Sequence, residues 1–543
     1  MPKRSMFSSM IYNGASKQGG NDSIVVDSFA RRSKFHKLFR QFQNWTERVV
    51  APVERVGNKV GKIAVKARYH KEPRSIDDDI RQTPKILGTG MNGAVRLAVS
   101  KSNEHQMYAV KSLMLQGGKE EDKERLIREM EIFLSLDHPR IARLYEVYET
   151  KNRLDLVMEY MEGGELFDRI ANNKGVFPEE DAAQAVWQML LALNYMHSCG
   201  LVHRDVKLEN FLYAKKDGNL LKLIDFGFSK VWDPNSHKTM GLSCGTLSYM
   251  APEVLKHSYT SQCDMWSLGV VAFSLLMGYM PFYGSAQYQS MCIERGKYKI
   301  KPEIWDRLSA PAQDFLMSLL QLDQQKRLSA KTAIQHQWIA MRRQEDREID
   351  SSVCDALREF GRASKFRRCC MAMMAWSLSF DERVQVSAYF TALDANKDGH
   401  IAPAELQEAL QDKFHVNEEE IRQIIDAMDS NKNGEIHYSD FLAAMVSTKI
   451  ELHDEILMAT FNKFDTDRTG YITERNLREV LGKKVDGVKV RTLLTELDLS
   501  QPNQISYPEF ETYLRKGPVA ASSKKPQHGT SLQWMSCFPC CSS

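Results

Sequence analysis

The spacing of apolar side chains predicts regions of different structure along the chain. Residues 29–49 place apolar side chains at helical spacing with arginines and lysines between them, which predicts an amphipathic basic helix. From about Ser75 the pattern favours strands, including a buried strand over residues 154–160. Asp264 begins an apolar helix, and residues 357–376 form a helical stretch that is basic and rich in large apolar side chains. The pattern therefore predicts a region rich in both strands and helices, followed by a mainly helical region.

Length and charge indicate several domains. At 543 residues the chain is too long for one core, given roughly 100–200 residues per domain. Residues 1–81 carry 17 Lys and Arg against 8 Asp and Glu, whereas residues 381–515 carry 15 against 26. A basic front and an acidic rear imply different partners for the two ends of the chain.

Composition argues against a secreted or membrane-spanning protein. The ten cysteines are scattered, and no uninterrupted apolar stretch reaches about 18 residues. We therefore expect reduced thiols and a cytoplasmic location. The basic helix at residues 29–49 leaves two alternatives open, because it can dock on the protein's own domains or lie on an anionic membrane.

A glycine-rich turn and a lysine on the following strand suggest a nucleotide site. Residues 88–95 read Gly-x-Gly-x-x-Gly-x-Val, a flexible hairpin whose backbone can close over phosphates. Alone, this motif also fits a dinucleotide fold or a plain turn. The strand at residues 108–111 carries Lys111, whose ammonium can hold phosphates, and Glu129 in the helical run at residues 126–136 is placed to pair with it.

The stretch at residues 203–210 has the composition of a catalytic loop for phosphoryl transfer. Asp205 is followed by Lys207 two residues on and by Asn210 five residues on, which gives a base, a cation and a metal ligand on one short loop. A second candidate metal ligand, Asp225, stands in an Asp-Phe-Gly sequence after a short apolar run.

Taken in order, these motifs resemble the protein kinase family over residues 75–339. The resemblance implies a two-lobed α+β fold and implies that Asp205 accepts the substrate hydroxyl proton while Lys207 steadies the transferred phosphoryl. Asn210 and Asp225 resemble the two Mg²⁺ ligands. The positions that the resemblance assigns to ATP are Leu87, Gly88, Gly90, Gly93, Val95, Ala109, Lys111, Glu159, Tyr160 and Leu212.

Several side chains bear on the phosphate acceptor. Lys207 in the catalytic loop and Thr246 before the Ala-Pro-Glu sequence point to serine or threonine rather than tyrosine. Glu165 and Glu209 match positions that receive an arginine upstream of the acceptor in basophilic kinases. Because bidentate bonds between carboxylate and guanidinium are strong, we predict a preference for Arg-x-x-Ser/Thr peptides.

The activation loop departs from the family pattern at the position that is usually phosphorylated. Leu242 occupies that position, so Arg204 has no evident phosphate to bind, although Ser243 is adjacent and could serve. We therefore expect the control of activity to lie elsewhere in the chain.

Two stretches of the acidic region fit the EF-hand calcium loop. This template has oxygen ligands at positions 1, 3 and 5, glycine at position 6, an apolar residue at position 8 and a carboxylate at position 12. The candidate ligands of the first hand are Asp394, Asn396, Asp398, His400 and Glu405. Those of the second hand are Asp429, Asn431, Asn433, Glu435 and Asp440. The shorter aspartate at position 12 of the second hand predicts weaker binding or Mg²⁺ occupancy.

Two further loops fit the template less well. The third ends at Asn476, which cannot supply a bidentate carboxylate, and the fourth has Pro502 where an oxygen ligand belongs. Whether either loop binds calcium stays open, but hands fold in pairs, so a silent hand still has a packing role. The candidate ligands are Asp465, Asp467, Thr469 and Tyr471 in the third hand and Asp498, Ser500, Gln504 and Glu509 in the fourth.

Kinase motifs, a basic junction and four tandem hands, in this order, resemble the calcium-dependent protein kinases of plants and protists over residues 75–515. The resemblance implies a multidomain protein in which an all-α calmodulin-like domain of four EF-hands follows the kinase fold. It also implies that the junction blocks the kinase at rest and that calcium-loaded hands release it in cis. The basic residues of the junction could occupy the acidic groove of Glu165 and Glu209, where the substrate is expected to bind. The stretch at residues 357–376 also has the character of a calmodulin target.

The same resemblance fixes the expected domains and cofactors. ATP, Mg²⁺ and Ca²⁺ are the expected cofactors, and proteins rather than nucleic acids are the expected substrates. The predicted parts are a basic extension at residues 1–74, partly disordered and containing the amphipathic helix, a kinase domain at 75–339, an autoinhibitory junction at 340–380, an EF-hand domain at 381–515 and a cysteine-containing tail at 516–543.

Some alternatives stay open at this stage. A calcium-responsive scaffold built on an inactive kinase is one, and activation by a separate calmodulin is another, although hands in the same chain disfavour it. In the tail, Cys537, Cys540 and Cys541 are candidates for S-palmitoylation. Acylation there, together with the basic helix at residues 29–49, would supply the two signals that stable membrane anchoring needs.

Overall fold

The computed structural model describes residues 56, 65–66, 68–90, 93–115, 120–172, 177–233, 239–241, 244–342, 349–446, 448–485, 487–496, 501 and 503–515. The predictions for the basic helix at residues 29–49, the tail cysteines, Leu242, Ser243, Asp498 and Ser500 fall outside the described residues. Among the helices of the described residues, none combines the length and the apolar character needed to cross a membrane.

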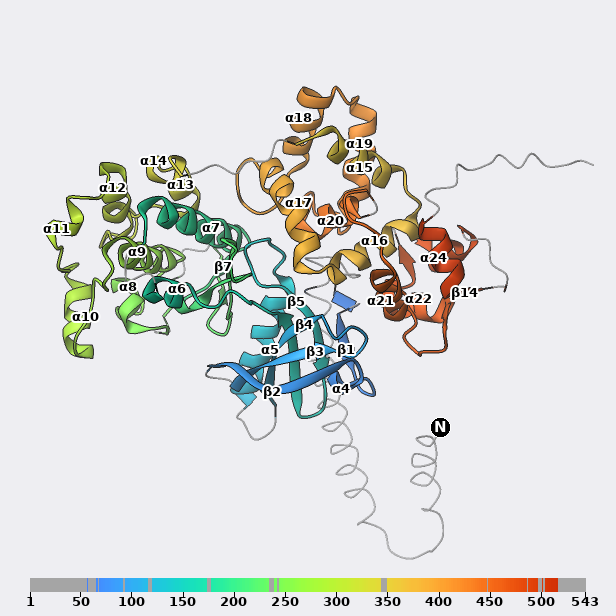
Figure 1. The fold of residues 1–543 in the computed structure, drawn as a ribbon, viewed down its shortest axis with the longest axis horizontal. Coiled ribbons are helices and arrows are strands. Elements are labelled where there is room, and N and C mark those ends of the chain that lie inside the picture. Colours follow the sequence, from blue (N-terminus) through green and yellow to red (C-terminus); the bar gives the residue numbers. More distant parts are fainter. Residues whose placement is uncertain are drawn as a thin grey trace, which may run out of the picture.

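The first lobe is built on a mixed six-stranded sheet in the order β1-β5-β6-β4-β3-β2 (Figure 1). Antiparallel pairing places Lys111 opposite Val95 on one neighbouring strand and opposite Leu156 on the other, so the lysine lies in a central strand. Helix α5 buries Leu126, Met130 and Phe133, which recur at helical spacing on one face. The elements of this lobe are β1 (Tyr69–Lys71), α4 (Ile76–Asp79), β2 (Ile80–Gly90), β3 (Gly93–Ser100), β4 (Met107–Met114), α5 (Glu120–Ser135), β5 (Leu144–Glu149) and β6 (Arg153–Glu159).

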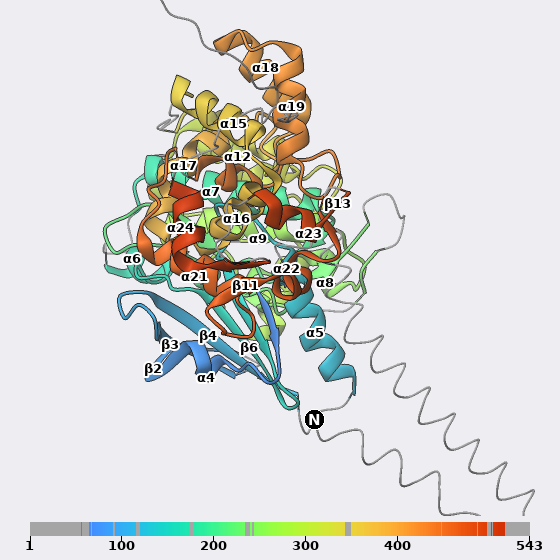
Figure 2. The same cartoon turned by 90° about the vertical axis from the view of Figure 1, so that its right-hand side faces the viewer.

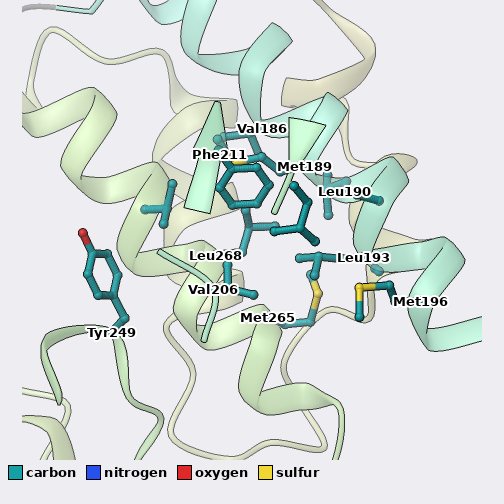
Figure 3. Packing of buried hydrophobic residues seen from close by; sticks show 14 of the residues in the cluster. Val186, Met189, Leu190, Leu193, Met196, Val206, Phe211, Tyr249, Met265 and Leu268 are labelled. Atoms are coloured by element: carbon teal, nitrogen blue, oxygen red, sulfur yellow. The ribbon is translucent and has the colours of Figure 1, made fainter. Parts of the chain in front are cut away.

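The second lobe is mainly helical. Its elements are α6 (Leu166–Asn172), α7 (Glu179–Ser198), β7 (Leu201–Val202), η1 (Leu208–Asn210), β8 (Phe211–Tyr213), β9 (Leu221–Leu223), β10 (Lys230–Val231), η2 (Leu247–Tyr249), α8 (Pro252–Leu255), α9 (Gln262–Met277), α10 (Ala286–Glu294), α11 (Pro302–Trp305), α12 (Ala310–Leu319), α13 (Ala330–Ile334) and α14 (Gln337–Ala340). Helices α7 and α9 are buried on almost every side, as expected of helices that are apolar all round. Figure 3 shows Val206 and Phe211 packed with Met189, Leu193 and Leu268 from these two helices. The predicted catalytic loop is therefore anchored in the core of this lobe.

The remaining elements form the helical region. They are α15 (Ser351–Arg362), α16 (Lys365–Ser377), α17 (Phe380–Leu393), α18 (Pro403–Phe414), α19 (Glu418–Met428), α20 (Tyr438–Met445), α21 (Asp454–Phe464), β11 (Tyr471–Thr473), α22 (Glu474–Leu481), β12 (Lys484–Val485), β13 (Val488–Lys489), α23 (Val490–Leu493), η3 (Leu494–Glu496), β14 (Gln504–Ser506) and α24 (Tyr507–Arg515). The predicted single helical stretch at residues 357–376 is two helices, α15 and α16. The break falls at Ala363, because Ser364 caps α16 by accepting a hydrogen bond from the backbone N–H of Arg367 at 3.3 Å.

The four hands lie as two pairs. A β-bridge between Ile401 and Ile436 joins the first two loops, and the short strands β11 and β14 join the last two, with Ile472 opposite Ile505. Helix α16 contacts α20 of the first pair and α21 of the second, and it lies between the two pairs in Figure 1. A two-lobed mixed fold followed by a helical EF-hand region is therefore present, as predicted.

The helical region is docked on both lobes. At the end of α16, Trp376 lies against the guanidinium groups of Arg68 and Arg143, at 3.5 and 4.2 Å from the ring centre. Arg143 also donates a hydrogen bond of 2.8 Å to the carbonyl oxygen of Ala375. On the second lobe, the side-chain amide of Asn194 donates to the carbonyl oxygen of Lys397 in the first hand at 2.6 Å. Both views of the fold show α16 and α17 beside the lobes (Figures 1 and 2).

Candidate active site and calcium-binding hands

The predicted catalytic loop converges on the carboxylate of Asp205, which is buried. Lys207 Nζ donates to Asp205 Oδ2 at 2.5 Å, and Asn210 Nδ2 donates to the carbonyl oxygen of Asp205 at 2.8 Å. Asp205 Oδ1 accepts hydrogen bonds from the backbone N–H and the hydroxyl of Thr246 at 3.1 and 3.0 Å. Three residues, Lys207, Asn210 and Thr246, therefore surround Asp205, and Thr246 is brought to it from 41 positions away.

The carboxylate of Asp264 fixes the backbone of the catalytic loop, a role that the sequence did not indicate. It accepts hydrogen bonds from the backbone N–H groups of His203 and Arg204 at 2.9 and 2.8 Å. Arg204 has φ 68°, a left-handed conformation that costs energy for a residue with a side chain. Charge-assisted hydrogen bonds from both N–H groups offset this strain. A lone acidic residue at the start of an apolar helix is the sequence signal that could have identified it.

The predicted ion pair between Lys111 and Glu129 is present. Lys111 Nζ lies 2.6 Å from Glu129 Oε1 and 3.3 Å from Asp225 Oδ1. Burial alone would lower the pKa of Lys111, but the two carboxylates outweigh it and the pKa is raised. Burial alone would likewise raise the pKa of Asp225, but Lys111 and the N–H of Gly227 outweigh it and the pKa is lowered. Lys111 therefore stays cationic and Asp225 anionic at neutral pH.

The residues predicted to surround ATP lie on the sheet of the first lobe and on the adjoining strands of the second. Gly88 pairs with Val95 across the β2–β3 hairpin, and Leu212 forms a bridge with Glu165 where the lobes meet. Gly93 has φ 128°, which L side chains rarely adopt, so the hairpin needs glycine at this position. The other members of the set that lie on these strands are Leu87, Gly90, Ala109 and Glu159, and Tyr160 follows β6.

The side chain of Glu159 has partners that sequence reasoning missed. Its carboxylate is buried and accepts hydrogen bonds from Lys222 Nζ at 2.7 and 2.8 Å and from Arg383 Nη2 at 2.6 Å. Burial alone would raise the pKa of Glu159, but the two cations outweigh it and lower the pKa to about 2. Arg383 belongs to α17 and also donates to the hydroxyl of Tyr145 at 2.9 Å. The helical region is thus bonded directly to the end of β6, at one of the positions predicted to contact ATP.

Glu165 and Glu209 form an acidic patch beside the catalytic loop. The pKa of Glu165 is raised by burial and by the neighbouring carboxylates of Asp168 and Glu209. Glu209 Oε2 accepts a hydrogen bond from the hydroxyl of Tyr249 at 3.3 Å. A carboxylate whose pKa is raised by neighbouring carboxylates in this way is stabilised by a bound cation.

Arg204 is held without a phosphate. Its Nε donates to the carbonyl oxygen of Phe228 at 2.6 Å, and its Nη1 donates to the hydroxyl of Tyr259 at 3.1 Å. Protein groups therefore already bind the guanidinium that would meet a phosphate in the activation loop.

The first hand has the backbone of a calcium loop. Asp394 accepts hydrogen bonds from the N–H groups of Asp398 and Gly399 at 3.1 and 2.9 Å, and Glu405 accepts from those of Asn396 and Ala402 at 3.0 and 2.8 Å. Burial, together with the carboxylates of Asp398 and Glu405, raises the pKa of Asp394 to about 7. Crowded carboxylates of this kind favour a bound cation.

The second hand repeats this arrangement. Asp429 accepts hydrogen bonds from the N–H groups of Asn433 and Gly434 at 3.1 and 3.0 Å. Asp440, the short position-12 residue, is buried and accepts from the N–H of His437 at 3.2 Å. Burial raises the pKa of Asp440 to about 7. The side-chain amides of Asn431 and Asn433 both face Nε2 of His437 at 3.1 Å.

The third and fourth hands keep parts of the same framework. Asp465 accepts hydrogen bonds from the N–H groups of Thr469 and Gly470 at 3.0 and 2.8 Å. At position 12, Asn476 Oδ1 accepts from the N–H of Thr473 at 2.8 Å. The hydroxyl of Thr469 meets Asp467 Oδ1 at 3.1 Å and the carbonyl oxygen of Tyr471 at 3.3 Å. In the fourth hand Glu509 accepts a hydrogen bond from the N–H of Ser506 at 2.8 Å. Ser506 lies two residues after Gln504, another candidate ligand of this hand.

The basic residues of the junction lie against the hands. Arg362 Nη2 and Arg358 Nε lie 2.7 and 3.4 Å from Glu420 Oε1, and Arg367 donates to the carbonyl oxygen of Tyr513 at 3.1 Å. In this arrangement the hands supply the partners of these three arginines, and their place in the substrate groove of the resting enzyme stays a prediction.

Comparison with known proteins agrees with the geometry. A model of the protein kinase domain matches residues 81–339, and a model of the EF-hand domain pair matches residues 385–446 and 454–515. Calcium-dependent protein kinase 4 of Plasmodium falciparum is 34% identical over 456 residues, which cover 80% of this chain and 85% of that protein. Calcium-dependent protein kinase 17 of Arabidopsis thaliana is 34% identical over 453 residues, which cover 81% and 84%. The chain therefore belongs to the calcium-dependent protein kinase family, and it is a calcium-regulated protein serine/threonine kinase.

Proposed function

We propose that Asp205 accepts the proton of the substrate hydroxyl while Lys207 steadies the phosphoryl group that is transferred from ATP. The contacts of both residues with Thr246 support this assignment, because they place a base, a cation and a hydroxyl at one point. Asn210 and Asp225 have the carboxamide and carboxylate oxygens that Mg²⁺ prefers, and Lys111 is held ready for the phosphates by Glu129. Bound Mg²⁺ would neutralise the charge that develops on the phosphates.

We also propose that the calcium-loaded hands keep the junction, α15 and α16, away from the substrate groove. One observation carries this proposal. The apolar side chains of α16, including Phe366, Met373 and Met374, are buried, and the helix lies between the two pairs of hands. Ion-free hands expose less apolar groove, so they would release the junction, whose arginines can then reach Glu165 and Glu209. The proposed parts are those expected from the sequence, with a kinase domain at 75–339, a junction at 340–380 and hands at 381–515.

Calcium titration of the full-length protein tests the switch. Kinase activity in calcium, without added calmodulin, should exceed kinase activity in chelator. Glu405→Gln should shift the activation curve to higher calcium concentration, because the first hand loses its bidentate ligand. Glu408→Gln is the matched control, since Glu408 lies one turn away on α18 and is exposed. Equal activity in calcium and chelator contradicts the switch. A requirement for added calmodulin would favour the separate-calmodulin alternative.

We propose that Glu165 and Glu209 bind an arginine of the substrate. Charge-assisted hydrogen bonds contribute about 1.5–3 kcal/mol, or roughly 10- to 150-fold in kcat/KM. Replacing that arginine of a peptide by alanine should therefore cost the native enzyme this factor, and Glu209→Gln should lose most of the discrimination. Glu162→Gln is the control, because Glu162 pairs with Lys215 instead. Equal use of both peptides by the native enzyme would refute the preference.

A further inference from the structure

The loops of the first two hands bring two histidines and a glutamate together at their shared β-bridge. Side-chain ligand atoms of His400, Glu435 and His437 all lie within 4.8 Å of one another. Nε2 of His400 lies 3.9 Å from Glu435 Oε2, and the two imidazole rings are 4.9 Å apart, edge to face. We infer that these three side chains form a binding site for a zinc ion, distinct from the calcium positions, and we call them the bridge cluster.

The calcium template explains why the bridge cluster can act separately. His400 and Glu435 stand at position 7 of their loops, where the backbone carbonyl, not the side chain, is the calcium ligand. Their side chains are therefore free to bind another ion while the loops hold calcium. Two imidazoles and one carboxylate suit Zn²⁺, whereas Ca²⁺ and Mg²⁺ prefer oxygen ligands alone.

A cysteine of the kinase domain lies beside the bridge cluster and could supply a fourth ligand after a side-chain movement. Cys199, which follows α7, places its Sγ 4.0 Å from Nε2 of His400 and is a free thiol. Tetrahedral Zn²⁺ with bonds of about 2.0–2.3 Å needs ligand atoms about 3.3–3.7 Å apart. The separations of 3.9 and 4.0 Å, and those of up to 4.8 Å within the cluster, are longer than this, so side-chain rotations would have to bring the ligand atoms together around the ion. The side chain of Glu435 is 51% exposed, so it is free to turn inward.

Two further observations point to a ligand at this place. His437 is buried, and its Nδ1 has no hydrogen-bond partner among the described residues. Zinc bound at Nδ1 requires the ring proton on Nε2, so the amide of Asn431 or Asn433, which now faces Nε2, would have to turn its oxygen toward that nitrogen. A buried ring nitrogen without a partner is costly unless something outside the chain binds it. The carboxylate of Asp398 lies 3.6 Å from Nδ1 of His400, which orients that imidazole with Nε2 toward the cluster.

Zinc at the bridge cluster would join three parts of the protein. His400 comes from the first hand, Glu435 and His437 come from the second, and Cys199 comes from the second lobe of the kinase. A bound ion would hold the hands paired and would also fasten them to α7, where Ser198 already donates to the carbonyl oxygen of Asp398 at 3.1 Å. Zinc at this site would therefore add to the effect of calcium in stabilising the docked arrangement of the hands on the kinase.

Zinc binding by the full-length protein in saturating calcium tests the site, because calcium then occupies its own loops. Competition against a chromophoric chelator should give one tightly bound zinc per chain. His400→Gln and Glu435→Gln should each weaken that binding at least about ten-fold, by analogy with the loss of groups that support a metal site. His105→Gln, which changes an exposed histidine of the first lobe, should not. Because Glu435 is exposed, its substitution leaves the fold intact. No zinc bound by the native protein, or unchanged binding by both variants, overturns the site.

Cobalt substitution tests the role of Cys199. Tetrahedral Co²⁺ gives intense visible bands, and a thiolate ligand adds a charge-transfer band in the near ultraviolet. Cys199→Ser should remove the charge-transfer band and keep the visible bands. A native protein that shows no such charge-transfer band overturns the link to the kinase domain.

Discussion

Arg383 bonds the helical region of the hands to Glu159 at the end of β6, and its removal should weaken the coupling of calcium to kinase activity. Arg383→Met keeps the apolar stem and removes the hydrogen bonds to Glu159 and Tyr145. Lys222 still pairs with Glu159 in this variant, so the buried carboxylate keeps a cationic partner. The full cost of about 3–5 kcal/mol for breaking a buried ion pair therefore does not apply. The loss should instead be about 2–3 kcal/mol for a charge-assisted hydrogen bond.

A loss of this size has a measurable effect on calcium activation. At 1.4 kcal/mol per factor of ten, about 2–3 kcal/mol lowers the docking equilibrium roughly 30- to 150-fold. Kinase activity against calcium concentration should then show a higher half-activating calcium and a lower maximum, and the calcium affinity should fall with it because docking and calcium binding are linked. Arg422→Met, an exposed arginine of α19 paired with Glu419, is the control. An activation curve for Arg383→Met that overlays the native curve would refute the coupling.

Five other predictions follow, the first four from the same geometry and the last from the sequence of the tail. Asp205→Asn should lower kcat by about 10²–10⁴ with folding unchanged, as measured with a peptide substrate, and full activity would revive the inactive-scaffold alternative. Asp440→Glu should tighten calcium binding by the second hand, as followed by calorimetry, because the longer carboxylate can bind through both oxygens. Calcium binding should weaken as pH falls from 8 to 6. The pKa of Asp394 and Asp440 is about 7, so calcium must displace protons from these carboxyl groups at the lower pH. The number of protons released on calcium binding measures this effect. By the same linkage, the free energy of unfolding of the ion-free hands should fall as pH rises from about 4 to 7, because the folded carboxyls hold protons that the unfolded ones release. Acyl-exchange labelling of the protein from cells should detect Cys537, Cys540 or Cys541, and no signal there would remove the anchoring proposal.

Local motifs carried most of what the sequence predicted. Asp205, Lys207 and Asn210 lie within six positions, and the hand loops each lie within twelve, so spacing alone placed their side chains together. The pair of Lys111 with Glu129 was also predictable, because a strand lysine and a helix glutamate recur in this order. Ser364 is a typical N-cap residue, so the sequence also indicated that a second helix begins there.

The docking contacts could not be predicted in this way. Arg383 and Glu159 are 224 positions apart, and no sequence pattern around a single arginine of α17 identifies its partner. The position of Trp376 between Arg68 and Arg143 likewise depends on how two domains meet. The bridge cluster arises because the loops of two hands and α7 converge, so it too is a product of tertiary packing.

Hydrogen exchange of the full-length protein in calcium and in chelator tests the central claim most directly. In calcium, the amides of α16 should be protected and the peptide containing Glu165 should exchange freely. In chelator, α16 should lose the protection that the hands provide, and the peptide containing Glu165 should gain protection as the junction covers the groove. Identical exchange of both peptides in the two conditions would contradict the account.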